Sequence, residues 1–111
     1  YLALVKAESY FDPDSTSRAG AKGLAQVIPK HHLEKIEVAR KKTGAYSIYE
    51  PRLNLFVGAW ALRDYIAETR SLEEGLLRYN GSALDPRKGY ARLVMAEAYR
   101  VETNFLRRKA E

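Results

Sequence analysis

Glu8 is the residue of this chain best placed for acid–base chemistry. It follows a mostly apolar run, residues 2–7, and a hydroxyl side chain, Ser9, comes directly after it. Where a helix leaves a hydrophobic core, burial disfavours the charged form of a carboxyl group and raises its pKa. A carboxyl group that keeps its proton near neutral pH can act as a general acid. On this segment alone, a solvent-facing glutamate is the commoner arrangement.

Other catalytic chemistries find few candidate residues. The chain has no cysteine, which excludes disulfides, zinc–thiolate sites and cysteine nucleophiles. Its two histidines, His31 and His32, are adjacent on an expected polar helix, so their side chains point in different directions and make a poor metal pair or catalytic triad. The glycine-containing segment at 20–23 lacks the spacing of a phosphate-binding loop. We therefore expect neither a metal nor a cofactor.

An amide and several tyrosines offer ligand contacts instead. Gln26 lies in an apolar segment, where a polar amide needs hydrogen-bond partners. The chain has eight tyrosines; Tyr79 precedes Asn80 at an expected helix end, and Tyr90 opens the last helix. A tyrosine suits stacking on sugar rings or bases, but it can equally fill a core with its hydroxyl at the surface. None of these residues identifies a function alone.

Helices must position these residues, because no segment shows the alternation typical of a strand. In the clearest helix, over residues 52–69, apolar side chains recur at spacings of four, three and four from Leu55 to Ile66. Ser71 and Glu74 form a capping box at the start of the next helix. The other predicted elements are helices at 1–10, 30–42, 71–79 and 89–109, a loop at 12–23, and a short helix or extended turn at 24–29. The sequence thus predicts an all-α fold of five or six helices.

Length and composition favour one compact domain over residues 1–111. Apolar residues make up 46% of the 111 residues, enough for a core. No stretch approaches the roughly 20 apolar residues of a membrane span, and none resembles a signal peptide. Because the first residues are expected to be helical without an N-cap, we expect a monomeric domain that is part of a longer chain.

The charge is distributed in a way that does not require nucleic acid as a partner. The net charge is +5, and basic clusters lie at 40–42 and 107–109, near expected helix C-termini. Cations there complement the helix dipole, which explains both clusters without a nucleic-acid surface. The excess positive charge still favours acidic partners, and a polyanionic cell-wall polymer would qualify.

Several motifs occur in a defined order along the chain. They are Glu8-Ser9, Phe11-Asp12-Pro13, Ser17, the segment 20–29, Pro51 with Asn54 and Gly58, Tyr79-Asn80, and Gly89-Tyr90 with Val94. In this order and spacing they resemble the soluble lytic transglycosylase family, which shares a lysozyme-like fold with goose-type lysozymes. Two positions depart from the family pattern: Ala25 replaces its usual methionine, and Gly81-Ser82 replaces the usual Ala-Gly after the Tyr-Asn pair.

The resemblance implies a substrate and a mechanism. The substrate would be peptidoglycan, cleaved at the β-1,4 bond between N-acetylmuramic acid and N-acetylglucosamine. Glu8 would protonate the glycosidic oxygen and then accept a proton from the muramyl 6-hydroxyl, which closes on the anomeric carbon to give a 1,6-anhydro product. The substrate's N-acetyl group can assist, so no second carboxylate would be needed.

The resemblance also implies which residues bind the substrate. They are Ser9, Ser17, Gln26, Tyr79, Asn80 and Tyr90. Ser9 would orient Glu8 or contact the substrate, while Gln26 and Asn80 would hydrogen-bond N-acetyl or hydroxyl groups. Tyr79 and Tyr90 would border the cleft near the sugar at the scissile bond. Asn54 and Gly58 are expected to be structural; a glycine inside a helix, about 1 kcal/mol less favourable than alanine, indicates that another helix approaches closely.

Three other functions stay open at this stage. A hydrolytic muramidase would need a second carboxylate roughly 5–9.5 Å from the first, and the sequence does not place Asp64 or Asp85. A non-catalytic glycan-binding domain would bind wall fragments without turnover. A basic nucleic-acid binder would show salt-dependent DNA binding. The location implied is the bacterial periplasm or cell envelope, or a phage particle that acts on the host wall.

Overall fold

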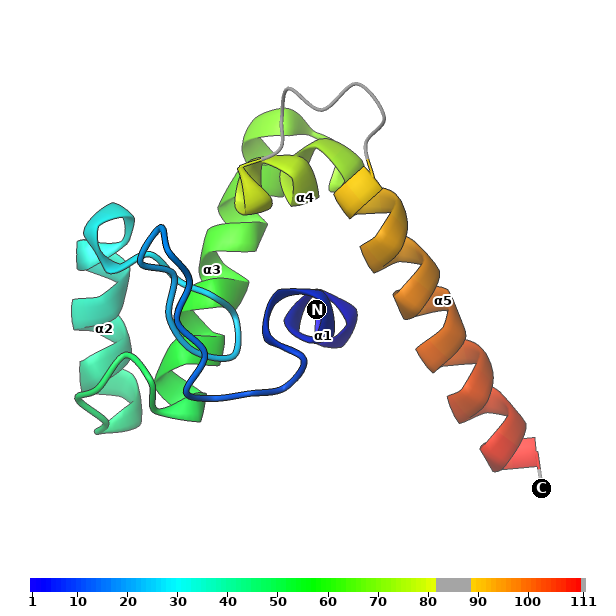
Figure 1. The fold of residues 1–111 in the computed structure, drawn as a ribbon, viewed down its shortest axis with the longest axis horizontal. Helices are drawn as coiled ribbons and strands as arrows, with labels where there is room; N and C mark the ends of the chain where they lie inside the picture. Colours follow the sequence, from blue (N-terminus) through cyan, green and yellow to red (C-terminus); the bar gives the residue numbers. More distant parts are fainter. Residues whose placement is uncertain (82–88, 111) are drawn as a thin grey trace.

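The computed structural model describes residues 1–81 and 89–110, and over these residues the chain is helical (Figure 1). The elements are α1 (Leu2–Ser9), a 3₁₀ turn η1 (Pro29–His31), α2 (Leu33–Thr43), α3 (Pro51–Thr69), α4 (Leu72–Asn80) and α5 (Gly89–Ala110). The described part contains no sheet, only two isolated antiparallel bridges that pair Lys22 with Thr16 and with Val27. The predicted all-α class is therefore confirmed. None of the helices in these two ranges is long and apolar enough to cross a membrane.

Helix α3 is the central helix, and it contributes to both halves of the core. Pro51 occupies its first turn, as the sequence predicts, and the Glu50 side chain caps it by accepting a hydrogen bond from the Leu53 amide at 2.9 Å. Helices α2 and α4 both pack on α3, while α5 packs on α1 and α4. Figure 1 shows α1 end-on in the space between α3 and α5.

Two buried clusters hold the fold together, and α3 contributes to both. One joins α1, α3, α4 and α5; its members include Leu4, Val5, Leu62, Leu76, Leu77 and Val94. The other joins the loop before α2 to α2 and the first half of α3 through Ala25, Val27, Ile36, Ala39, Leu53 and Val57. Burial of this apolar surface fixes α1 and the loop on the same central helix.

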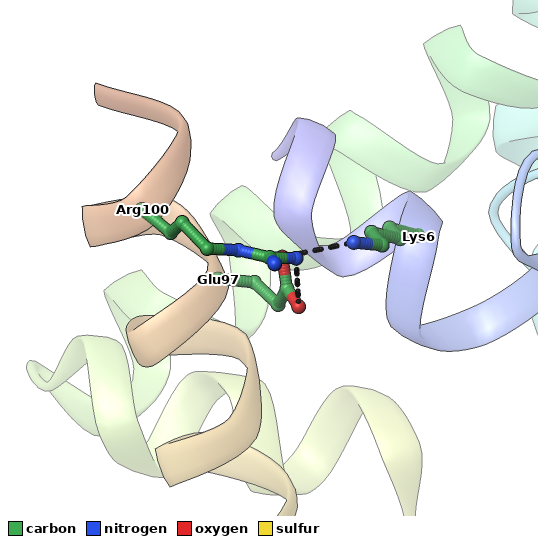
Figure 2. A network of polar contacts seen from close by, with 3 residues as sticks. All are labelled: Lys6, Glu97 and Arg100. Carbon is green, nitrogen blue, oxygen red and sulfur yellow. Dashed lines mark hydrogen bonds and ion pairs between the residues drawn. The ribbon is translucent and has the colours of Figure 1, made fainter. Parts of the chain in front are cut away.

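A charge cluster links α5 to α1 (Figure 2). The ammonium group of Lys6 on α1 lies 3.2 Å from the Glu97 carboxylate on α5. The Arg100 guanidinium donates to both Glu97 oxygens at 2.7 Å. The hydrogen bond from Arg100 lowers the pKa of Glu97, with a smaller contribution from Lys6, so Glu97 is ionised at neutral pH.

One local expectation needs correction. The helix predicted from residue 30 begins at Leu33, because Pro29 starts a separate 3₁₀ turn that ends where the His32 backbone leaves the helical region. His31 and His32 therefore precede α2 and do not lie on it. Of the two forms left open for the segment at 24–29, the structure has the extended turn, apart from the last residue, Pro29, which begins the 3₁₀ turn.

Both ends of α4 lie where the sequence predicts them. Ser71 caps the helix by accepting a hydrogen bond from the Glu74 amide at 3.2 Å. Gly81 ends it with φ +81°, in the left-handed region that glycine adopts without strain. This C-terminus places Tyr79 and Asn80 beside α1. The predicted break at Asp85-Pro86 lies outside the described residues.

Candidate active site

Glu8 lies in the last turn of α1, where the helix leaves the core. Leu4 and Val5, one turn earlier, are 0% and 3% exposed, and Glu8 itself is half-buried. The helix ends directly afterwards, because Tyr10 adopts φ 52° and its amide closes the last turn on the Lys6 carbonyl. Burial raises the pKa of Glu8 above its ordinary value, although hydrogen bonds from Tyr90 and Asn80 oppose part of this effect.

Two donors from distant helices converge on one oxygen of Glu8. The Tyr90 hydroxyl, at the start of α5, donates to Oε1 at 2.6 Å. The Asn80 side-chain amide, at the end of α4, donates to the same oxygen at 3.4 Å. Burial and the charge of Glu8 raise the pKa of Tyr90, so its hydroxyl stays protonated and remains a donor.

Ser9 connects the end of α1 to the neighbouring loop. Its hydroxyl donates to the Leu24 carbonyl at 2.7 Å and also lies 3.1 Å from the Val5 carbonyl in its own helix. The side chain is 9% exposed. Ser9 thus fixes the loop against the turn that carries Glu8, which suits a positioning role better than direct contact with a ligand.

Asn54 of α3 holds the same loop from the opposite side. Its Oδ1 accepts from the Ala25 amide at 2.7 Å, and its Nδ2 donates to the carbonyls of Lys22 and Ile48 at 2.8 Å each. Asn54 is 0% exposed. The loop comes so close that a Cβ at Gly23, whose φ is +80°, would lie 2.3 Å from Asn54 Nδ2. The structural role expected for Asn54 follows from these contacts.

Tyr79 also binds the loop. Its hydroxyl donates to the Ala25 carbonyl at 2.5 Å, and burial raises its pKa well above the ordinary value. Gly58 allows this approach, because a Cβ there would lie 2.3 Å from the Tyr1 hydroxyl and 2.9 Å from the Tyr79 hydroxyl. The expectation for Gly58 is therefore right about close approach. The approaching groups are the hydroxyl of Tyr79, which lies on the neighbouring helix α4, the hydroxyl of Tyr1 and the side chain of Ala25.

Gln26 and Ser17 make contacts within the loop. Gln26 adopts φ 53°, and its side-chain amide nitrogen donates to the carbonyls of Gly23 at 2.9 Å and Ser15 at 3.1 Å. The Ser17 hydroxyl accepts from the Ala21 amide at 3.1 Å and so closes the turn over residues 17–21. Of the two, Gln26 borders the cleft described next.

A cleft of about 430 Å³ lies between this loop, the start of α2 and the end of α4. Its lining residues are Gln26, Val27, Ile28, His31, His32, Tyr65, Arg78, Tyr79, Asn80 and Gly81. Asn80 both lines the cleft and contacts Glu8, which connects the carboxyl group to this space through one side chain. Glu8, Ser9, Ser17 and Tyr90 are not themselves among the lining residues. Sequence reasoning missed Tyr65, Arg78 and the role of the histidines. Of these residues, the sequence could have suggested Arg78 alone, because it directly precedes Tyr79 in the Tyr-Asn motif.

Other carboxylates in the described residues have different partners. Asp64 pairs with Lys35 at 3.1 Å, and Asp12 accepts the Asp14 amide at 2.9 Å in the loop. Asp85 lies outside the described residues. In residues 1–81 and 89–110, no group of three or more His, Cys, Asp or Glu side chains could hold a metal ion.

The fold and the site define an all-α domain with one half-buried acid at the edge of an amide- and tyrosine-lined cleft. Comparison with known proteins agrees: the family model "Transglycosylase SLT domain" matches residues 1–99. The chain belongs to the SLT transglycosylase family. It is also similar to a transglycosylase of Enterobacteria phage PRD1, with 32% identity over 78 residues. That match covers 70% of this chain and 26% of the phage protein, and no solved structure matches.

Proposed function

We propose that this domain is a peptidoglycan lytic transglycosylase. It cleaves the β-1,4 bond between N-acetylmuramic acid and N-acetylglucosamine and leaves a 1,6-anhydromuramyl end. The observation that carries the proposal is the Glu8 carboxyl group, half-buried, raised in pKa and hydrogen-bonded by Tyr90 and Asn80 beside an open cleft. Membership of the SLT family supports the same reading.

In the first step, Glu8 acts as the general acid. Because both Tyr90 and Asn80 donate to Oε1, the proton of the neutral carboxyl group resides on Oε2. Oε2 donates that proton to the glycosidic oxygen as the bond from this oxygen to the muramyl anomeric carbon breaks. The N-acetyl group of the same sugar stabilises the positive charge that develops at the anomeric carbon.

In the second step, Glu8 acts as the general base. Its carboxylate takes the proton of the muramyl 6-hydroxyl while that oxygen bonds to the anomeric carbon. The proton balance then closes, because Glu8 ends the cycle protonated and no water is consumed. Tyr90 and Asn80 stabilise the carboxylate that exists between the two steps, since both donate to it.

The carboxylate arrangement favours this reaction over hydrolysis. A two-carboxylate glycosidase needs a second acid to activate water or to act as nucleophile. Asp64, the aspartate of α3, is paired with Lys35. A hydrolytic muramidase on the same fold is the second candidate, and a non-catalytic glycan-binding domain is the third. The domain would act on the wall from the bacterial envelope or from a phage particle, and the PRD1 relative favours the phage.

Replacement of Glu8 by Gln tests the proposal. E8Q should abolish turbidity loss of a cell-wall suspension, because the amide cannot donate or accept the catalytic proton. The matched control is E102Q, which removes an exposed carboxylate on α5 and should keep full activity. Mass spectrometry of wild-type products should find ends that lack one water relative to reducing ends. Reducing ends would identify a muramidase, and a fully active, folded E8Q would exclude Glu8 as the acid.

A further inference from the structure

One wall of the cleft carries positive charge that the proposed chemistry does not use. Arg78, in the last turn of α4, lines the cleft together with His31 and His32 from the segment before α2. None of the described residues that line the cleft is Asp or Glu. The cleft wall therefore presents one permanent cation and two imidazoles, a combination suited to an anion.

The Arg78 guanidinium is available to a ligand. Its ion pair with Glu68 is long, at 3.4 Å, and the two side chains are 51% and 59% exposed. An exposed pair of this kind holds its partners weakly, because solvent screens the charges and both side chains lose freedom on pairing. A carboxylate in the cleft can therefore take the place of Glu68.

The imidazole of His32 is a neutral part of the same wall, because burial lowers its pKa and the charges of Lys35 and His31 lower it further. Its Nδ1 is buried from solvent and has no hydrogen-bond partner among the described residues, so a ligand in the cleft meets other atoms of the ring. The two histidine rings pack edge to face at 6.5 Å. Nearby, Lys35 of α2 pairs with Asp64 of α3, so these two charges largely cancel at this side of the cleft.

Arg78 lines the same cleft as one of the two donors to Glu8. Asn80 lines the cleft and donates to Glu8, and Arg78 of the same helix lines the same cleft. In the proposed substrate, the muramic acid whose anomeric carbon reacts also carries a lactyl ether that ends in a carboxyl group. The sugar that meets Glu8 therefore brings a carboxylate-bearing side chain to the same region.

We propose that Arg78, with His31 and His32, binds the carboxylate of the muramic acid side chain and so distinguishes muramic acid from N-acetylglucosamine. This inference rests on the proposed function. The carboxylate has two sources: the lactyl group itself where no peptide is attached, and the stem peptide where it is. A guanidinium recognises both by the same paired hydrogen bonds.

Binding to three glycans tests this site in the E8Q background, which prevents turnover. The probes are peptide-free glycan strands, peptide-bearing strands and chitohexaose, which has no carboxylate. R78Q should weaken binding of the carboxylate-bearing strands about three- to tenfold and leave chitohexaose binding unchanged. R78K should retain part of the affinity, because it keeps the charge without the planar fork. R63Q removes an exposed arginine of α3 outside this cleft and should change none of the three.

The pattern of losses decides the inference. If R78Q binds peptide-free strands more weakly, the ligand of Arg78 is the lactyl carboxylate. If its affinity falls only for peptide-bearing strands, the ligand is a carboxylate of the stem peptide. Equal loss on all three glycans, or no loss on any, overturns the carboxylate site. Turnover by wild type and by R78Q is measured in parallel. An active R78Q with unchanged preference refutes this site alone, whereas an inactive wild type refutes the proposed function.

Discussion

At the scale of the residue, the Glu8 carboxyl group is balanced between two influences. Burial raises its pKa, and donors from Tyr90 and Asn80 lower it, with burial the larger effect. A group that must give a proton and then take one back benefits from such a balance, because neither protonation state is strongly disfavoured. Tyr90, at 2.6 Å, is the stronger donor and the more informative one to remove.

Y90F should shift the pH profile of the reaction. The acid step needs protonated Glu8, so kcat/KM is lost as pH rises through the pKa of Glu8. Without the Tyr90 hydroxyl the carboxylate is less stable, this pKa rises further, and the alkaline limb moves to higher pH. The rate at the optimum should fall about tenfold, because the carboxylate intermediate loses a charge-assisted hydrogen bond. The measurement is kcat/KM on soluble glycan across pH.

Y79F is the matched control for Y90F. The Tyr79 hydroxyl donates to the Ala25 carbonyl and not to Glu8, so its removal should leave the alkaline limb in place. A shift of the limb in Y79F, or none in Y90F, would contradict the assignment of Tyr90 as the partner of the acid.

The sequence identifies the acid and its two donors only through the ordered motifs. Residues 8, 80 and 90 belong to three helices, and no local pattern places their side chains together. Arg78 and the histidines escape prediction for a different reason. Arg78 and the two histidines line one cleft because of the path of the loop before α2. The adjacent positions of His31 and His32 in the sequence do not reveal that path.

At the scale of the element, the loop between α1 and α2 is the part that shapes the cleft. It has little regular structure, so side chains from outside hold it: Asn54 from α3, Tyr79 from α4 and Ser9 from α1. The sequence predicts a long loop and a glycine-rich turn. It does not predict that Asn54 fixes this loop, because Asn54 is one polar residue inside an otherwise clear apolar helix pattern.

N54A should loosen this loop and destabilise the domain. It leaves the Ala25 amide and two carbonyls without their hydrogen-bond partner. An unpaired polar group inside the protein destabilises the folded state. The free energy of unfolding should fall by about 2–4 kcal/mol, measured by urea denaturation. N104A is the control: Asn104 is exposed on α5 and accepts a hydrogen bond only from Arg107 in the same helix turn among described contacts, so its change should stay within about 0.5 kcal/mol.

At the scale of the whole molecule, α5 reaches beyond the body it packs on (Figure 1). Apolar residues recur every three or four positions along this helix, at Tyr90, Val94, Ala98, Val101 and Phe105, but the stripe is buried only in its first part. Val94 is 5% exposed, whereas Val101 is 38% and Phe105 63% exposed. The radius of gyration, 14.5 Å, exceeds the roughly 13 Å of a compact chain of this length. Sequence periodicity defines a helix face and does not say where its packing partner ends.

The two parts of the stripe should respond differently to truncation. V94A removes methyl groups from the cluster that joins α1, α4 and α5, and should lower the free energy of unfolding by about 1–3 kcal/mol. F105A changes a larger but exposed side chain and should alter it by less than about 0.5 kcal/mol. Urea denaturation of both variants makes the comparison. A larger loss in F105A would mean that the far end of α5 packs on the domain.

The partners of Glu8 lie far along the polypeptide from it, 72 residues away at Asn80 and 82 at Tyr90. During synthesis Glu8 therefore leaves the ribosome well before Tyr90. A nascent chain that ends before α5 holds the carboxyl group without the Tyr90 hydroxyl that tunes it. Under the proposed function, the tuned form of the acid is therefore assembled only when α5 docks on α1, after the intervening helices have been made.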